Sequence, residues 1–354
     1  MELKTLLDGM VSQESLDLHL ISGHAPAMRL NGRALRQDGA VLDADAIEEM
    51  LRPHLTLREQ ALLEEQRADI DKTLRWDDRA FMLHVFHERG QIAAAIRALP
   101  TNVPTLDDLY EAGIVRSLLT SLITQPSGLV IITGHTGSGK ITTLAAMIET
   151  INLSQTRRIV TIEDPIQYEF VSKQSLITQR NIGEDAASYR DAARSAFRED
   201  ADVVLIGEMH DLDTLSLALS LADTGHLVLL PVHCERAAQA VYRLSEVFPE
   251  PRGHIRRLLA RNLLAVVAQA LLPRADRPGR VPVNEVLLPT PQVRQLISEG
   301  VQELDAAIAL GRAEGMQSMD DGIVELFEAG AITEATARAH VADPGRLAAG
   351  AKND

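Results

Sequence analysis

A glycine-rich stretch that ends in a lysine carries the strongest chemical signal in the sequence. It runs from Gly134 to Lys140 with the spacing G-x-x-x-x-G-K, after an apolar run at 128–134 and before a helical pattern, LAAMIETIN. Glycines at this spacing let backbone N–H groups converge on phosphate oxygens, and the lysine brings a positive charge to the β- and γ-phosphates. The start of the helix adds its own partial positive charge. The stretch therefore predicts a phosphate-binding loop rather than a plain glycine-rich turn.

Position 141 departs from the usual form of such a loop. Ser or Thr normally stands there and offers a hydroxyl oxygen to Mg²⁺, whereas this chain has Ile141. Thr142 lies one residue further on, about 100° around the helix. We therefore expect weaker metal binding. The residues that we expect to contact the phosphates are Gly134, Thr136, Gly137, Ser138, Gly139, Lys140, Ile141 and Thr142.

Carboxylates follow two of the expected buried strands. Glu163 and Asp164 come after RIVTI, and Glu208 comes after VVLIG. In a parallel sheet the carboxyl ends of the strands open on the ligand crevice, so Glu163 and Glu208 are placed to reach Mg²⁺ or to orient and deprotonate an attacking water. Acidic residues also cap helices after strands, an alternative that the phosphate-binding loop makes less attractive.

Histidines and arginines give a weaker signal. His226 and His233 flank the strand-like run LVLLPV, and their odd separation points them to opposite faces, which argues against a simple two-histidine metal pair. From spacing alone, an ordinary structural role is favoured for each histidine. Arginines of the kind that stabilise transition-state charge, with Arg198 as our catalytic candidate, are Arg97, Arg180, Arg190, Arg194 and Arg198. The last three are four residues apart, so a solvated helix face is the simpler interpretation.

The elements that must position these residues change character along the chain. Residues 1–100 mix short strand-like pieces with a charged helical stretch at 44–66, which predicts a small α+β domain. Residues 101–114 predict a linker that runs into a helix. From 115 to 290, continuous apolar strands alternate with helices, which predicts a mostly parallel sheet covered on both faces. Residues 291–354 read as a helical region.

Composition narrows the classes of function. The 354 residues suggest about two domains, and the net charge of −15 disfavours a sequence-independent grip on nucleic acid. The single cysteine, Cys234, cannot form an internal disulfide, so the cytosol is the default compartment. The longest apolar run, at 263–272, is interrupted by Gln269 and is too short for a membrane span. Any membrane role therefore needs a partner.

Taken in order, these segments resemble those of the PilT-type retraction ATPases of type IV pili, within the larger family of secretion ATPases. GHTGSGKITTLAAM is similar to the Walker A segment, IVTIEDPIQYEF to the Asp box, FREDADVVLIGEMHD to the Walker B segment and TGHLVLLPVH to the His box. TPQVRQLISEG at 290–300 resembles the retraction signature of that family. The likeness extends over nearly the whole chain, with five motifs in the family order.

The resemblance implies an N-terminal PAS-like domain joined to a RecA-like ATPase domain, assembled as a homo-hexamer that hydrolyses ATP with Mg²⁺ and drives twitching motility. It assigns phosphate binding to Lys140 and the metal and attacking water to Glu163 and Glu208. It makes His226 and His233 the His-box histidines, with His226 as a catalytic candidate. It also implies a cytoplasmic protein held at the inner membrane by a pilus platform protein, with no nucleic-acid partner.

The chain departs from the family pattern at four positions. Ile141 replaces the Walker A Ser, His210 replaces the Arg usual after GEM, Pro231 interrupts the His-box strand, and Met82 stands where the family presents an arginine, although Arg79 and Arg89 are close by. Together these departures predict an altered or slower motor. Two alternatives stay open: a weakly or non-hydrolysing regulatory subunit that co-assembles with an active paralogue, and a DNA-translocating ring, which the net charge disfavours.

Restoring the hydroxyl at position 141 tests the metal argument. Water in place of that hydroxyl keeps the coordination number of Mg²⁺ but is less firmly positioned, so the chemical step should suffer more than binding. We expect Ile141→Ser to raise kcat by roughly tenfold, about 1.4 kcal/mol of barrier, with a smaller effect on ATP affinity. The measurement is kcat and the Mg²⁺ half-saturation of both proteins. If neither changes, the missing hydroxyl does not limit the enzyme.

Overall fold

The computed structural model describes residues 2–13, 15–30, 33–37, 40–77, 79–208, 211–246, 253–300 and 303–350, so His210 lies outside the described residues. The chain divides into two compact units, the first formed by Met1–Asn102 and Asp164–Glu169 and the second by Val103–Glu163 and Phe170–Asp354. Most of the segment expected as a linker, 101–114, therefore packs into the second unit. The physical reason is burial, because Leu106 and Tyr110 lie in an apolar core of that unit.

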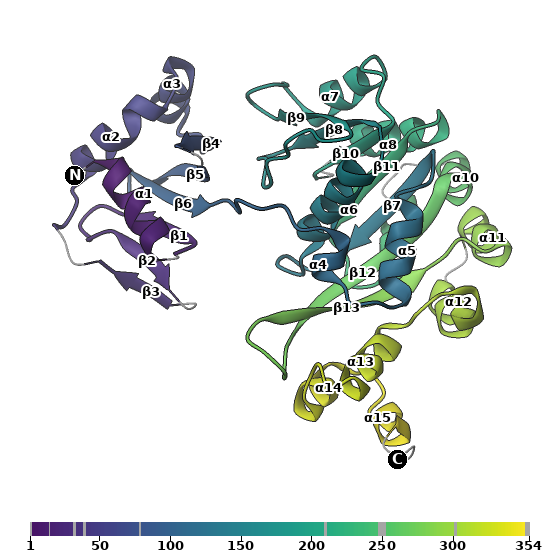
Figure 1. The fold of residues 1–354 in the computed structure, drawn as a ribbon. Helices are drawn as coiled ribbons and strands as arrows, with labels where there is room; N and C mark the ends of the chain where they lie inside the picture. Colours follow the sequence, from purple (N-terminus) through teal and green to yellow (C-terminus); the bar gives the residue numbers. More distant parts are fainter. Residues whose placement is uncertain are drawn as a thin grey trace. The chain divides into compact units, whose positions relative to one another are not determined.

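The first unit is a twisted antiparallel sheet with helices on one face (Figure 1). Its elements are α1 (Leu3–Ser12), β1 (Asp17–Leu20), β2 (Ala27–Leu30), β3 (Arg33–Arg36), α2 (Ala44–Leu51), the 3₁₀ turn η1 (Arg52–His54), α3 (Leu57–Gln66), β4 (Ile70–Trp76), β5 (Arg79–Glu88) and β6 (Gln91–Ala98). Among the described residues the strands pair in the order β3-β2-β1-β6-β5-β4. Alternate strand residues such as Leu18, Leu83 and Ile96 share a core with α1, α2 and α3, as the two-residue period of a strand requires.

The second unit is built on a mostly parallel sheet. Its elements are α4 (Leu106–Leu109), α5 (Ile114–Leu122), β7 (Gly128–Thr133), α6 (Lys140–Ser154), β8 (Arg158–Glu163), β9 (Leu176–Asn181), α7 (Tyr189–Ala196), β10 (Val203–Ile206), α8 (Leu212–Asp223), β11 (Leu227–Val232), α9 (Ala237–Glu246), α10 (Gly253–Asn262), β12 (Leu263–Pro273), β13 (Arg280–Leu287), α11 (Pro291–Glu299), α12 (Leu304–Leu310), η2 (Gly311–Glu314), α13 (Met319–Glu328), α14 (Glu334–His340) and α15 (Gly345–Gly350). In the described chain the strand order is β13-β12-β7-β11-β10-β8-β9, and all neighbours are parallel except the hairpin β12–β13.

Helices cover both faces of this sheet, as the continuous apolar strands predict. On one face, side chains such as Val130 and Ile132 pack with α4, α5 and α6. On the other face, Leu129 and Ile131 pack with the helices from α7 to α12. The fully buried strand β7 therefore carries the loop that follows it on a rigid base.

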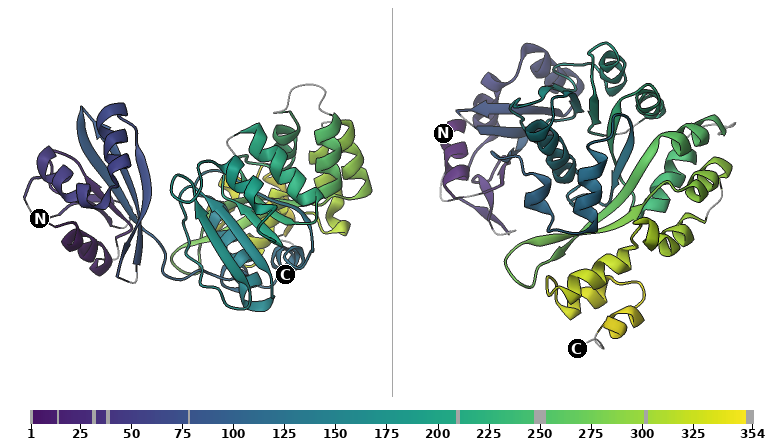
Figure 2. Two further views of the ribbon diagram at one scale, coloured as in Figure 1. Left: turned by 90° about the horizontal axis from the view of Figure 1, so that it is seen from above. Right: turned by 45° about the vertical axis from the view of Figure 1, so that its right-hand side comes forward.

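The C-terminal helices gather beside the far part of the β12–β13 hairpin (Figure 2). Leu272, Val281 and Val283 of the hairpin share a small core with α13, α14 and α15. The backbones of Val286 and Gln317 exchange hydrogen bonds of 2.7 and 3.2 Å just before α13 begins. None of the helices in the described ranges combines the length and apolar character that a membrane crossing requires.

Pro231 affects one side of its strand only. Leu227 donates its N–H to Asp202 O, and alternate residues of a strand face the same neighbour, so position 231 also faces β10. Pairing of β11 with β10 stops at Leu229, whereas pairing with β7 continues through Pro231 to Val232. The missing N–H therefore shortens the β10 ladder and leaves the β7 ladder whole.

Candidate functional site

The phosphate-binding loop joins β7 to α6, where the sequence predicts it. Gly137 and Gly139 have φ values of +80° and +86°, a region that favours glycine, and Gly139 directly precedes the first residue of α6. The N-cap residue, Gly139, has no side chain to cap this helix, so the partial positive charge of the helix start faces the loop. Thr136 and Gly137 are exposed, whereas Ser138 is buried. The loop has the form that phosphate binding needs.

Lys140 is buried at the base of this loop. Its Nζ donates hydrogen bonds to the carbonyl oxygens of Gly134 and His135, both at 2.8 Å. Burial lowers the pKa of the ammonium group, and the negative charge of Glu208 opposes that shift. The lysine thus closes the loop on itself, and phosphate oxygens would replace the two carbonyls as its partners.

The two predicted carboxylates lie on neighbouring strand ends. Glu163 ends β8, where its Oε1 accepts hydrogen bonds from Thr161 Oγ1 at 2.7 Å and from Gln179 Nε2 at 3.3 Å. Glu208 follows β10, the parallel neighbour of β8. Gly207 lies so close that an added Cβ would stand 3.2 Å from Glu163 Cγ. The structure therefore brings both carboxylates to the edge of the sheet that carries Lys140.

His233 joins this edge, and Ile141 and Thr142 lie beside it. His233 follows β11, and its Nε2 is 3.4 Å from Glu208 Oε1. Ile141 is partly buried against the apolar core under α4, α5 and α6, so its side chain is used for packing. Thr142 lines a cavity next to the loop.

His226 and Arg198 lie at the opposite edge of the sheet. The N–H of Gly128, the first residue of β7, donates to His226 O at 3.0 Å, and β7 then runs about 20 Å before the loop begins. The His226 ring contacts Phe197 edge to face at 5.7 Å, next to the exposed Arg198. The reason is chain direction, because residues before a parallel strand lie opposite those after it. The structure does not bring these two catalytic candidates to the phosphate loop of the same chain.

Three of the other arginines make local contacts. Arg180 Nη1 binds Glu199 at 2.9 Å, and Arg190 Nη1 binds Asp213 at 3.0 Å. In the first unit, Met82 of β5 stands directly across from Arg97 of β6. The Arg97 Nε donates to Asp17 Oδ1 at 2.7 Å. A guanidinium thus lies on the strand next to the position where Met82 replaces the family's arginine.

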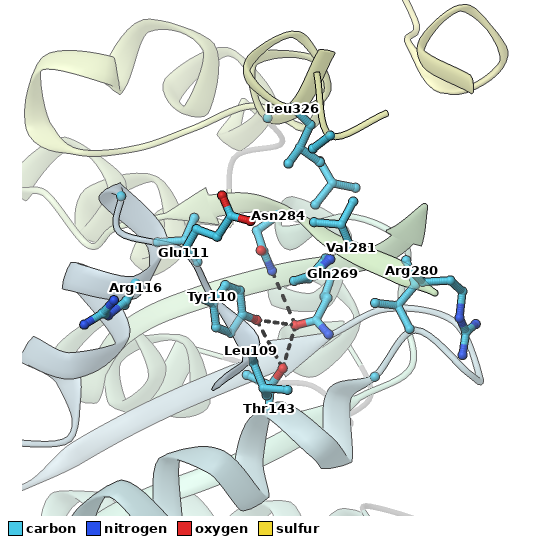
Figure 3. Close-up of a pocket in the computed structure, with 18 of the residues that line it drawn as sticks. Leu109, Tyr110, Glu111, Arg116, Thr143, Gln269, Arg280, Val281, Asn284 and Leu326 are labelled. Carbon is cyan, nitrogen blue, oxygen red and sulfur yellow. Dashed lines mark hydrogen bonds between the residues drawn. The ribbon is translucent and has the colours of Figure 1, made fainter. Parts of the chain in front are cut away.

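Sequence reasoning missed a buried polar cluster beside the loop (Figure 3). Gln269 Oε1 accepts hydrogen bonds from Tyr110 OH and Thr143 Oγ1, both at 2.8 Å, and has a longer contact of 3.4 Å with Asn284 Nδ2. Gln269 Nε2 donates to Ser138 O of the loop at 2.7 Å. The only signal in the sequence is that Gln269 interrupts an apolar strand. Its partners are far apart in the chain, so no local pattern points to them.

A cavity of about 790 Å³ opens next to this cluster. Its lining comes from the segment that holds Tyr110, from the start of α6, from the β12–β13 hairpin and from α13. Arg280 on its wall lies 3.5 Å from Gly137 O, which joins the cavity to the phosphate loop. Together, the parallel sheet, the loop and the acidic strand ends define a RecA-like P-loop ATPase.

Comparison with known proteins extends this class. A family model described as type II/IV secretion system protein matches residues 77–338. A twitching motility protein of Neisseria gonorrhoeae is 38% identical over 316 residues, which cover 88% of this chain and 83% of that protein. A type IV pilus retractation ATPase, PilT, of Pseudomonas aeruginosa is 34% identical over 347 residues, which cover 96% and 97%. A crystal structure of the pilus retraction motor PilT with bound ADP matches with a TM-score of 0.88 at 33% identity and covers 99% of both chains.

The chain belongs to the type II/IV secretion system protein family. The resemblance to PilT-type ATPases that the sequence motifs indicate is confirmed, and so is the expected combination of an N-terminal α+β domain with a RecA-like ATPase domain. The chain is accordingly an ATPase.

Two loop glycines provide a matched test of this geometry. A Cβ at Gly137 would meet open space, whereas a Cβ at Gly139 would stand 2.8 Å from Gln269 Nε2. Gly137→Ala should therefore cost only backbone strain, about 1 kcal/mol, and Gly139→Ala about 1–3 kcal/mol more because Gln269 must move. Urea unfolding followed by circular dichroism measures both. Equal losses in the two variants would contradict the close packing of Gln269 on the loop.

Proposed function

We propose that this chain is the ATP-hydrolysing motor of a type IV pilus retraction machine. The observation that carries the proposal is the convergence of Lys140, Glu163 and Glu208 on one edge of the sheet. Likeness to a retraction motor solved with ADP, over 99% of both chains, supports the same conclusion. Hydrolysis at this edge would supply the energy for movement.

In this proposal the nucleotide lies along the loop and into the adjoining cavity. The phosphates accept hydrogen bonds from N–H groups of the loop and of the start of α6, among them those of Gly137, Gly139 and Lys140, with the Lys140 ammonium as the compensating charge. The base and ribose enter the cavity of about 790 Å³, whose volume suits a ligand of this size. Arg280 lies between the cavity and the loop, so it faces the point where the ribose of the nucleotide would join its phosphates.

The two carboxylates have separate surroundings that suit separate roles. Glu163 is buried and oriented by Thr161 and Gln179, so we assign it to holding and positioning the metal ion. Glu208 is partly exposed beside His233, so we assign it to orienting and deprotonating the attacking water. His233 is placed to hold Glu208 in position.

Carboxylate oxygens suit Mg²⁺, which compensates the charge of the phosphate oxygens when it is bound. Among the described residues there is no group of three His, Cys, Asp or Glu side chains able to hold a metal on their own. When bound, the ion would be held by Glu163, Glu208, waters and phosphate oxygens, with no hydroxyl from Ile141. His226 and Arg198 have no part in this scheme within one chain, since they lie at the other edge.

We further propose that the chain assembles as a homo-hexamer on the cytoplasmic side of the inner membrane, bound to the platform protein of the pilus. The regulatory-subunit alternative has one observation in its favour, the apolar packing of Ile141. Lys140, Glu163 and Glu208 are all in place, which supports hydrolysis instead. Co-assembly with an active paralogue remains compatible with either.

Removing the ammonium group tests the nucleotide site. Lys140→Ala should weaken ATP binding at least about a hundredfold, on the order of 3 kcal/mol, because a charged partner of the phosphates is lost. Isothermal titration calorimetry on the full chain measures it. The control is Lys4→Ala, which breaks an exposed pair with Asp8 on α1 of the first unit and should leave binding unchanged. An unmutated, folded chain that binds no ATP would refute the motor.

Assembly provides a separate test. If the ring has a higher affinity for ATP than the single chain, ATP stabilises the ring by mass action. Light scattering should then report a mass near six times 38.7 kDa, with a larger hexamer fraction in ATP. A monomer at micromolar concentration, with and without ATP, would exclude the ring.

A further inference from the structure

Gln269 is a buried polar residue in the middle of an apolar strand. It is 4% exposed, with Ala268 and Val267 of the same strand fully buried before it. Its amide nevertheless has partners on both sides. Nε2 donates to the loop carbonyl Ser138 O. Oε1 accepts from Tyr110 and Thr143, as Figure 3 shows. A residue that served only to fill space here would be apolar.

The loop is shaped so that Gln269 can come close. A Cβ at Gly134 would lie 2.3 Å from the backbone oxygen of Gln269, and a Cβ at Gly139 would lie 2.8 Å from its side-chain nitrogen. Both glycines also have positive φ values, +149° and +86°. The phosphate motif explains these two glycines by the close approach of a phosphate. The same glycines also leave room for Gln269 on the other side of the loop.

Tyr110 belongs to the segment by which the chain enters the second unit. The unit boundary lies between Asn102 and Val103, and the segment then docks on α6 at two points. Leu106 N donates to Thr150 Oγ1 at 3.1 Å, and Tyr110 OH contacts Thr143 Oγ1 at 3.1 Å. Burial raises the pKa of Tyr110 to about 12, so its hydroxyl keeps its proton at all physiological pH values.

Thr143 and Thr150 are seven residues apart and share one face of α6, the helix that begins at Lys140. The entry segment is thus attached to α6, whose first residue is the proposed phosphate ligand Lys140. Gln269 links the entry segment to the loop a second time, through Ser138 O. When a phosphate replaces the carbonyl oxygens of Gly134 and His135 as the partner of the Lys140 ammonium group, the loop loses two of its hydrogen bonds. The Gln269 amide connects the same loop, at Ser138 O, with the Tyr110 hydroxyl.

We infer that Gln269 is a positioning residue that holds the phosphate-binding loop and couples nucleotide occupancy to the entry segment, residues 103–112. The inference rests on the proposed function, since it needs a nucleotide at the loop. Gln269 also lines the cavity given to the base and ribose, and the role assigned to it is to hold the loop rather than to bind the nucleotide. Its effect is on the placement of the γ-phosphate for attack and on the order of the entry segment.

Hydrogen exchange of the full chain with and without Mg-ADP tests the coupling. In the unmutated protein, ADP should slow exchange of the amides at 103–112 at least about threefold, Leu106 and Tyr110 among them. In Gln269→Leu that slowing should be lost, while ADP affinity falls less than about tenfold. Steady-state kinetics should show kcat reduced about tenfold and KM changed less than about threefold, because positioning rather than binding is impaired.

The matched control is Glu285→Gln, next to the Asn284 that pairs across from Gln269. Glu285 is also buried, but it faces the other side of the sheet, where it binds Arg236 and Ala237 N. This variant should lose stability yet keep both the ADP-dependent slowing and kcat. If both variants lose the slowing equally, or if Gln269→Leu keeps it, the inference is overturned.

Two further outcomes are decisive. An unmutated chain that binds ADP without any change at 103–112 overturns the coupling but leaves the proposed function standing. A chain that binds no ADP refutes the proposed function and the inference with it. Should Gln269→Leu fail to fold, Tyr110→Phe removes one hydroxyl from the same link and must likewise abolish the slowing, and retained slowing there overturns the inference.

Discussion

Parallel pairing of β7, β11, β10 and β8 decides which residues of this chain can meet. A parallel strand sends everything that follows it to one edge of the sheet and everything that precedes it to the other. Lys140, Glu208 and His233 follow strands, Glu163 ends one, and all four share an edge. The position of each is then refined by local contacts, such as the carbonyls around the ammonium and the Thr161 hydroxyl beside Glu163.

The parts of the site that could be predicted from sequence are those that strand and loop chemistry determine locally. The glycine spacing before Lys140 and the apolar runs before Glu163 and Glu208 each carry their own signal, and the parallel sheet follows from them. The place of His226 cannot be read from spacing, because odd spacing says which face a side chain points to, whereas reaching the loop of the same chain depends on the end of the strand. That second property needs the chain direction, which spacing does not contain.

Long-range contacts account for the rest of what the sequence hid. Tyr110 and Gln269 lie 159 residues apart, and no local sequence pattern around either residue predicts their contact. Pro104 and acidic residues are the linker signals at 101–114, and the folded chain adds that Leu106 and Tyr110 are buried, with Leu106 N hydrogen-bonded to Thr150 of α6. Departures such as Ile141 were visible in the sequence. Their cost depends on packing that only the folded chain reveals.

The close approach of β12 to the loop has an evolutionary consequence. An alanine at Gly134 would collide with the backbone oxygen of Gln269, and an alanine at Gly139 would collide with its side chain. A substitution at either loop position therefore depends on the state of position 269. A replacement in the loop would have to be preceded by a shorter side chain or a retracted strand at 269. Related sequences should therefore change positions 139 and 269 together and keep glycine at 134, where an added Cβ would meet a backbone oxygen that every residue at 269 carries, which makes the hairpin a partner in the history of the loop as well as in its structure.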